Sequence, residues 1–72
     1  MKSTIDARGL SCPQPVLMTL DAIKKTSENE ILVMVDSDVS KENVCRAAEN
    51  RKWKVTKIDS ENNTFHILLH RG

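Results

Sequence analysis

The stretch RGLSCPQPVLMTLDAIKK, residues 8–25, contains a short loop followed by an amphipathic segment. From residue 16 onward it carries apolar side chains at helical spacing, namely Val16, Leu20 and Ile23, with Leu17 widening the stripe. Pro13 and Pro15 fall in the first helical turn, where backbone N–H groups have no intrahelical partner and proline removes no hydrogen bond. The pattern therefore predicts a helix over residues 13–25, with Cys12 at or beside its N-cap.

Strand-like segments flank this helix and recur later in the chain. We expect strands over residues 3–7, 30–36, 53–58 and 64–70, and a polar hairpin loop over 59–63. A second helix is expected over about residues 39–51, with Asp38 or Ser40 as its cap. The order is βαβαββ, so the first two strands should be parallel and the last two an antiparallel hairpin. The expected fold is α+β: a two-layer α/β sandwich with both helices on one face of a four-stranded mixed sheet.

Alternation along two strands divides their side chains between the faces of this sheet. The side chains expected to face the helices are Ile31, Val33, Val35, Phe65, Ile67 and Leu69. Leu32, Met34 and Leu68 would then lie together on the helix-free face. They form either a docking or dimerisation patch or a set of scattered surface hydrophobes.

Size and charge exclude several classes of protein. The chain has 72 residues, with eleven Lys and Arg against ten Asp and Glu and a net charge of +1. A single domain over residues 1–72 is expected, without a broad basic surface for strong direct nucleic-acid binding. The longest apolar run has five residues, too few for a membrane span, and two cysteines are too few for a secreted disulfide framework. We therefore expect a soluble, cytoplasmic protein that is a monomer or a weak dimer.

Cys12 is the residue with the clearest chemical potential. At a helix N-terminus, unpaired N–H groups and the helix dipole favour the thiolate, and Arg8 could add positive charge. A thioredoxin-like dithiol site would need a second cysteine at position 15, where this chain has Pro15. A lone activated thiol could carry a sulfur atom as a persulfide. From spacing alone, a buried and inert cap cysteine is equally compatible.

The residues around Cys12 resemble the signature of a known family. Asp6, Gly9, Cys12, Pro13 and Pro15 match the pattern Asp-x-x-Gly-x-x-Cys-Pro-x-Pro (the CPxP motif) of the small sulfur carriers known as TusA, SirA or YedF. The resemblance implies a sheet order of 1-2-4-3 and a persulfide on Cys12. It also implies a cysteine desulfurase or rhodanese-like sulfur donor, and relay to an acceptor protein, for instance towards 2-thiouridine in tRNA. Residues 35–44 look more like the YedF branch, which is linked to selenium metabolism.

Other polar residues have more than one interpretation. Cys45 is either a half-buried core side chain or a resolving thiol for Cys12. His66 and His70 lie about 13 Å apart along one strand, too far to share a metal ion, so no metal and no cofactor is expected. A basic run is either a solvated face or a guide for an acidic partner; it consists of Arg51, Lys52, Lys54 and Lys57. Trp53 and Phe65 are expected in the core, which disfavours base stacking.

The resulting hypothesis is a persulfide-carrying sulfur-transfer protein that acts with a partner enzyme. Cys12 would be acceptor and donor, Pro13 and Pro15 would rigidify the helix start, and Gly9, Arg8 and Asp6 would shape the loop. The alternative is a non-catalytic interaction or redox-regulatory module. In that case Cys12 is only a helix cap or a switch thiol.

Overall fold

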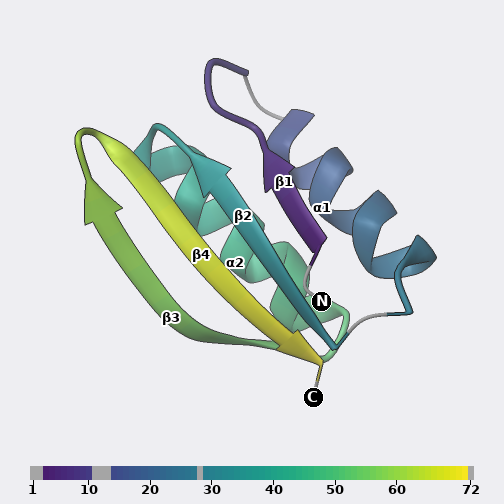
Figure 1. Ribbon diagram of the computed structural model, residues 1–72. Helices are drawn as coiled ribbons and strands as arrows, with labels where there is room; N and C mark the ends of the chain where they lie inside the picture. The colour runs from purple at the N-terminus through teal and green to yellow at the C-terminus, as the bar shows by residue number, and fades with distance from the viewer. Residues whose placement is uncertain (1–2, 11–13, 28, 72) are drawn as a thin grey trace.

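The structure is a computed structural model that describes residues 3–10, 14–27 and 29–71. The elements, in chain order, are β1 (Ser3–Asp6), α1 (Gln14–Lys25), β2 (Glu30–Val35), α2 (Asp38–Asn50), β3 (Trp53–Glu61) and β4 (Thr64–Arg71). The predicted βαβαββ order is confirmed (Figure 1). Both β1 and β2 end one residue earlier than expected.

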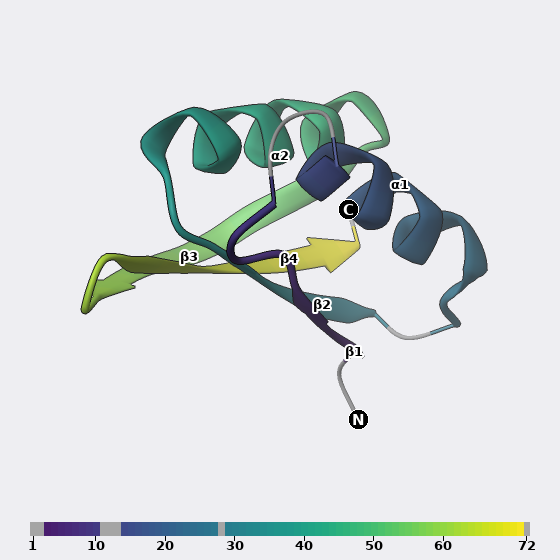
Figure 2. The same cartoon turned by 90° about the horizontal axis from the view of Figure 1, so that it is seen from above.

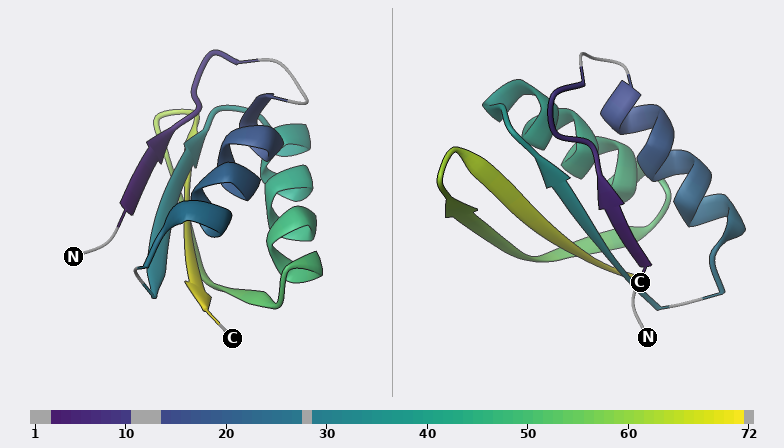
Figure 3. Two further views of the ribbon diagram at one scale, coloured as in Figure 1. Left: turned by 90° about the vertical axis from the view of Figure 1, so that its right-hand side faces the viewer. Right: turned by 45° about the horizontal axis from the view of Figure 1, so that its top comes forward.

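The four strands form one mixed sheet in the order β1-β2-β4-β3. β1 pairs with β2 in parallel, and β4 lies antiparallel between β2 and β3. Both helices cover the same face of this sheet, as Figure 2 and Figure 3 show. The two-layer architecture and the 1-2-4-3 order implied by the resemblance are therefore confirmed.

The core lies between the helices and the central strands. Ile31, Val33 and Val35 of β2, with Ile67 and Leu69 of β4, are completely buried. The helices and Trp53 complete the cluster, with Val44 and Ala48 buried on α2. Complete burial of a Val, Leu or Ile side chain contributes about 1.5–3 kcal/mol, so these central strands dominate the stability of a small sheet.

The buried face of α1 differs in part from the expected stripe. Val16 and Ile23 pack against the core, but Leu17 is 53% exposed and Leu20 is only half-buried. Pro15 and Thr19 are the fully buried residues of this helix. Burial of Thr19 costs little because its hydroxyl donates to the Pro15 carbonyl oxygen at 2.8 Å. The most deeply buried positions of α1 are therefore not those of the two leucines.

The second helix begins one residue earlier than expected, and its cap is neither Asp38 nor Ser40. Ser37 is the N-cap, and its hydroxyl oxygen accepts a hydrogen bond from the Ser40 backbone N–H at 3.1 Å. At the other end, Lys52 has a φ of 66°, and its N–H donates to the Glu49 carbonyl oxygen at 3.0 Å. A left-handed residue after the last turn is a common way to end a helix.

The hairpin between β3 and β4 is tighter than expected. Strand β3 continues to Glu61, so the turn consists of Asn62 and Asn63 and not of residues 59–63. The two asparagines have φ values of 50° and 63°, as in a type I′ turn. Asparagine tolerates this left-handed conformation, and the short turn extends the ladder to the pair Glu61 and Thr64.

We predict that Asn63→Gly stabilises the protein, because glycine adopts positive φ without steric cost. The expected gain in the free energy of unfolding is about 0.5 kcal/mol, measured by urea denaturation. Asn63→Ala is the matched control and should lower the free energy by about 1 kcal/mol. Equal stability of the two variants would contradict the assigned turn.

Candidate functional site

The candidate site lies at the edge of the sheet where β1 and β2 end. Because these strands are parallel, the loop after β1 and the start of α2 are brought to the same end of the molecule, beside the start of α1 (Figure 1). The Ala7 backbone N–H donates to the Met34 carbonyl oxygen at 2.8 Å and extends the strand pairing into the loop. Ser11, Cys12 and Pro13 lie outside the described residues. In the sequence Cys12 falls between Leu10 and Gln14.

Asp6 and Arg8 form a two-pronged ion pair at the start of this loop. Arg8 Nε donates to Asp6 Oδ1 and Arg8 Nη2 donates to Asp6 Oδ2, both at 2.8 Å. The Arg8 backbone N–H also donates to Asp6 Oδ1, at 3.2 Å. Much of the Arg8 charge is therefore neutralised locally, which weakens the expectation that Arg8 polarises the Cys12 loop.

The pair also determines the protonation of both groups. The hydrogen bonds from the Arg8 side chain and backbone lower the pKa of Asp6 from 3.8 to about 2. In turn, the hydrogen bond to the Asp6 carboxylate raises the pKa of Arg8. Both side chains are about half exposed, so the pair acts chiefly on the geometry of the loop and little on global stability.

Gly9 is held by a residue that the sequence analysis did not single out. Its backbone N–H donates to Asp36 Oδ2 at 2.7 Å, and its φ is 76°. Asp36 directly follows β2. A parallel pairing of the first two strands places the residues after each strand at one edge, so the sequence did contain a signal for this contact.

Pro15 lies in the first turn of α1 and is completely buried. The ring is removed from solvent, and its missing N–H costs no intrahelical bond. Its carbonyl oxygen also accepts a hydrogen bond from the Thr19 hydroxyl, and this bond links the first turn of α1 to the second.

Cys45 is half-buried on α2 and packs against the core. Burial raises the pKa of its thiol, and the nearby Glu49 carboxylate raises it further. Among the described residues Cys45 has no disulfide partner. Its burial agrees with the interpretation as a half-buried core side chain, and the alternative of a resolving thiol is not tested, because Cys12 lies outside the described residues.

The structure places the expected apolar patch on the helix-free face of the sheet. Leu32 and Leu68 are directly opposite each other on β2 and β4, and Met34 is opposite His66. All four side chains are half-buried.

In the part of the chain that the structure describes, no cluster of three or more His, Cys, Asp or Glu side chains is placed to hold a metal ion.

The basic run does not form one surface. Arg51 lies at the end of α2, on the helix side of the molecule. Lys54 and Lys57 are opposite His70 and Leu68 in the β3–β4 ladder and so belong to the helix-free face. Lys57 also lies 3.6 Å from Asp59. Arg51 therefore lies on the opposite side of the sheet from Lys54 and Lys57.

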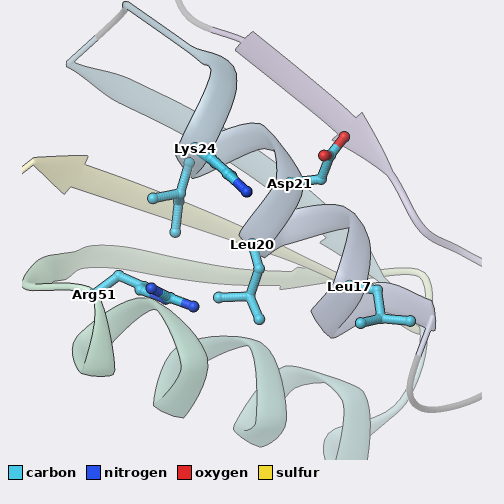
Figure 4. A pocket seen from close by; sticks show the side chains of 6 residues that line it. Leu17, Leu20, Asp21, Lys24 and Arg51 are labelled. Carbon is cyan, nitrogen blue, oxygen red and sulfur yellow. The ribbon is translucent and has the colours of Figure 1, made fainter.

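Leu17 and Leu20, which are not buried against the sheet, line a groove between α1 and α2. It has a volume of about 420 Å³ and is lined by Leu17, Leu20, Asp21, Ile23, Lys24 and Arg51 (Figure 4). A neighbouring hollow of about 380 Å³ shares Leu20 and Arg51 and adds Val16, Ala47 and Asn50. Periodicity alone assigned these leucines to the core, so the groove was missed.

Comparison with known proteins identifies the family of this chain. The family model described as sulfurtransferase TusA matches residues 3–71. The chain belongs to the TusA family. It is 34% identical over 68 residues to a Methanocaldococcus jannaschii protein named "Putative sulfur carrier protein MJ0990", a match covering 93% of this chain and 91% of that protein. The names of the family and of this relative indicate a sulfur carrier.

Two further comparisons agree with this assignment. A protein of Aquifex aeolicus, also named "Putative sulfur carrier protein", is 43% identical over 35 residues, which cover 49% of this chain and 18% of that protein. The crystal structure of a SirA-like protein from Desulfitobacterium hafniense superposes with a TM-score of 0.86 at 29% identity, covering 100% of this chain and 99% of that one. The narrower resemblance to the YedF branch stays a prediction.

Among the described residues, no helix is long and apolar enough to cross a membrane.

We predict that the Asp6 carboxyl titrates near pH 2 and that Arg8→Ala returns its pKa towards 3.8. Because the folded pKa is lowered, the pair contributes stability above the unfolded pKa of about 3.9 and loses it as the pH falls towards 2. Carbon-13 NMR of the carboxyl measures the midpoint. Arg46→Ala, on the exposed side of α2, is the control and should leave it unchanged. An unshifted midpoint in Arg8→Ala would show that the ion pair does not persist in solution.

Proposed function

We propose that this protein carries sulfur as a persulfide on Cys12 and passes it to a partner protein. The match of residues 3–71 to the sulfurtransferase TusA family supports this most directly. In the sequence Cys12 falls three positions after Gly9, in the loop that hydrogen bonds hold at Arg8 and Gly9, and two positions before Gln14, where α1 begins. The protein would act as a carrier that depends on a partner enzyme for the rest of the chemistry.

The transfer reaction needs no external oxidant. The Cys12 thiolate attacks the outer sulfur of a persulfide on the donor, a cysteine desulfurase or rhodanese-like enzyme. A sulfur–sulfur bond forms to Cys12, the bond within the donor persulfide breaks, and the donor cysteine leaves as a thiolate. In the second step an acceptor thiolate attacks the outer sulfur of the Cys12 persulfide, and Cys12 leaves as a thiolate.

The two cysteines should differ in reactivity. A cysteine beside a helix N-terminus has a lowered pKa, because the unpaired N–H groups stabilise negative charge. Burial and Glu49 raise the pKa of Cys45, which keeps that residue a protonated thiol at neutral pH. Only Cys12 is then proposed to be a nucleophile, and this requires a reducing compartment such as the cytoplasm.

We predict that incubation with a cysteine desulfurase and free cysteine adds about 32 Da, one sulfur atom, to the intact mass. Cys12→Ser should abolish the added mass, and Cys45→Ser should retain it. If only Cys45→Ser lost the added mass, Cys45 and not Cys12 would be the thiol that carries the sulfur. No added mass with several desulfurase and rhodanese donors would favour the alternative of a non-catalytic module.

We further propose that the sulfur donor docks on the groove between α1 and α2. Leu17 lies in the first turns of the helix that follows Cys12, and its 53% exposed side chain is available for contact. Lys24 and Arg51 outnumber Asp21 in the lining of the groove, so the groove carries a net positive charge, which suits an acidic and apolar donor surface. The Leu32, Met34 and Leu68 patch lies on the opposite face of the sheet and is the competing docking surface.

We predict that Leu17→Gln and Arg51→Gln each raise the KM for the carrier in sulfur loading by about tenfold, as expected for side chains that contribute strongly to an interface. Leu68→Thr, on the helix-free face, is the matched control and should leave the KM unchanged. The alkylation rate of Cys12 by iodoacetamide should be the same in all three variants. The opposite pattern, with only Leu68→Thr impaired, would place the donor on the sheet.

A further inference from the structure

The loop that precedes Cys12 is joined to a distant part of the chain by one carboxylate. Asp36 Oδ2 accepts the Gly9 backbone N–H at 2.7 Å, across 27 positions of sequence. A short hydrogen bond to a charged acceptor is roughly twice as strong as one between neutral groups. Both residues are exposed, so this bond adds little to global stability but restrains the loop locally.

The hydrogen bond restrains Gly9, a residue whose backbone can otherwise adopt many conformations. Gly9 has a φ of 76°, and a Cβ built at this position would meet nothing within 4 Å. Glycine therefore serves backbone conformation here and does not relieve a steric clash. A glycine held by no partner visits many conformations, so the accepting carboxylate selects one.

Asp36 is itself well anchored. It follows β2 and immediately precedes Ser37, the N-cap of α2, whose hydroxyl oxygen accepts the Ser40 N–H. The Asp36 charge also reaches the Arg8 guanidinium and contributes, after Asp6, to raising the pKa of Arg8. One end of the contact is thus part of a strand-to-helix junction, and the other end is the loop that leads to Cys12.

We propose that Asp36 is a positioning residue for Cys12: its hydrogen bond to Gly9 holds the loop in the conformation from which the thiol reacts. This rests on the proposed function in assigning Cys12 as the nucleophile. Asp36 acts through the Gly9 backbone and touches no reacting atom. The residue adds a long-range element to the motif, because it lies 24 positions after Cys12 in the sequence.

Two variants separate the hydrogen bond from the charge. Asp36→Asn and Asp36→Ala both remove the negative charge, but only asparagine keeps an oxygen that can accept from Gly9. Asp38→Asn is the charge control, because Asp38 is an exposed carboxylate two residues away that pairs with Lys41 at 3.6 Å. All variants are made in full chains with Cys45→Ser, so that Cys12 is the reacting thiol, and circular dichroism and thermal unfolding confirm that each one folds.

The first measurement is the exchange of the Gly9 amide hydrogen by NMR. We expect exchange at least fivefold faster in Asp36→Ala than in Asp36→Asn, as the loss of an ordinary hydrogen bond implies. The Asp38→Asn variant should exchange Gly9 at the parental rate. Equal Gly9 exchange rates in the two Asp36 variants would overturn the proposal.

The second measurement is the rate of Cys12 alkylation by iodoacetamide as a function of pH. At equal charge, the thiol of Asp36→Ala should titrate at a higher pH than that of Asp36→Asn, because a released loop holds the thiolate near the helix start for less of the time. Identical profiles would overturn the proposal. Neither measurement uses a sulfur donor. A failure of Cys12 to accept sulfur would therefore contradict the proposed function, whereas the role of Asp36 is decided by the two measurements above.

Discussion

The parallel pairing of β1 with β2 is the interaction on which the arrangement of this protein depends. It aligns the ends of two strands, and the bond from the Ala7 N–H to the Met34 carbonyl oxygen carries the alignment into the loop. Because each strand leads into a helix, both helix starts are brought to the same end of the sheet. The Gly9 loop and Asp36 can meet only because of this register. Antiparallel pairing would have put them at opposite ends.

The two faces of the sheet differ in how much apolar surface they bury. The helix side holds the completely buried side chains of β2, β4 and α2, while the helix-free face keeps only the half-buried patch around Leu32 and Leu68. Pro15 and Thr19 are the fully buried residues of α1, whereas Leu17 is exposed and lines the groove beside α2. A chain this small buries only about 60% of its unfolded surface, so exposed apolar groups remain available for a carrier that must bind partners.

Much of this could be predicted, because periodicity and proline positions are local signals. The element order, both helices and the central strands followed from the spacing of apolar residues, and the family followed from the motif around Cys12. The sheet order came only from the resemblance, since alternation says which face a side chain occupies and nothing about which strand is its neighbour. The two-residue turn was also local, and the pair Asn62 and Asn63 signalled it, yet the polar residues before it suggested a longer loop.

The amino-acid sequence was sufficient for the fold class and for Cys12 as the candidate nucleophile, because both depend on residues close together along the chain. It was insufficient for the groove and for Asp36. Leu20 has the same helical spacing whether it faces a sheet or a neighbouring helix, and only the packing of α1 against α2 settles its environment. The contact between Gly9 and Asp36 spans 27 positions, so it exists only once two strands have paired in register.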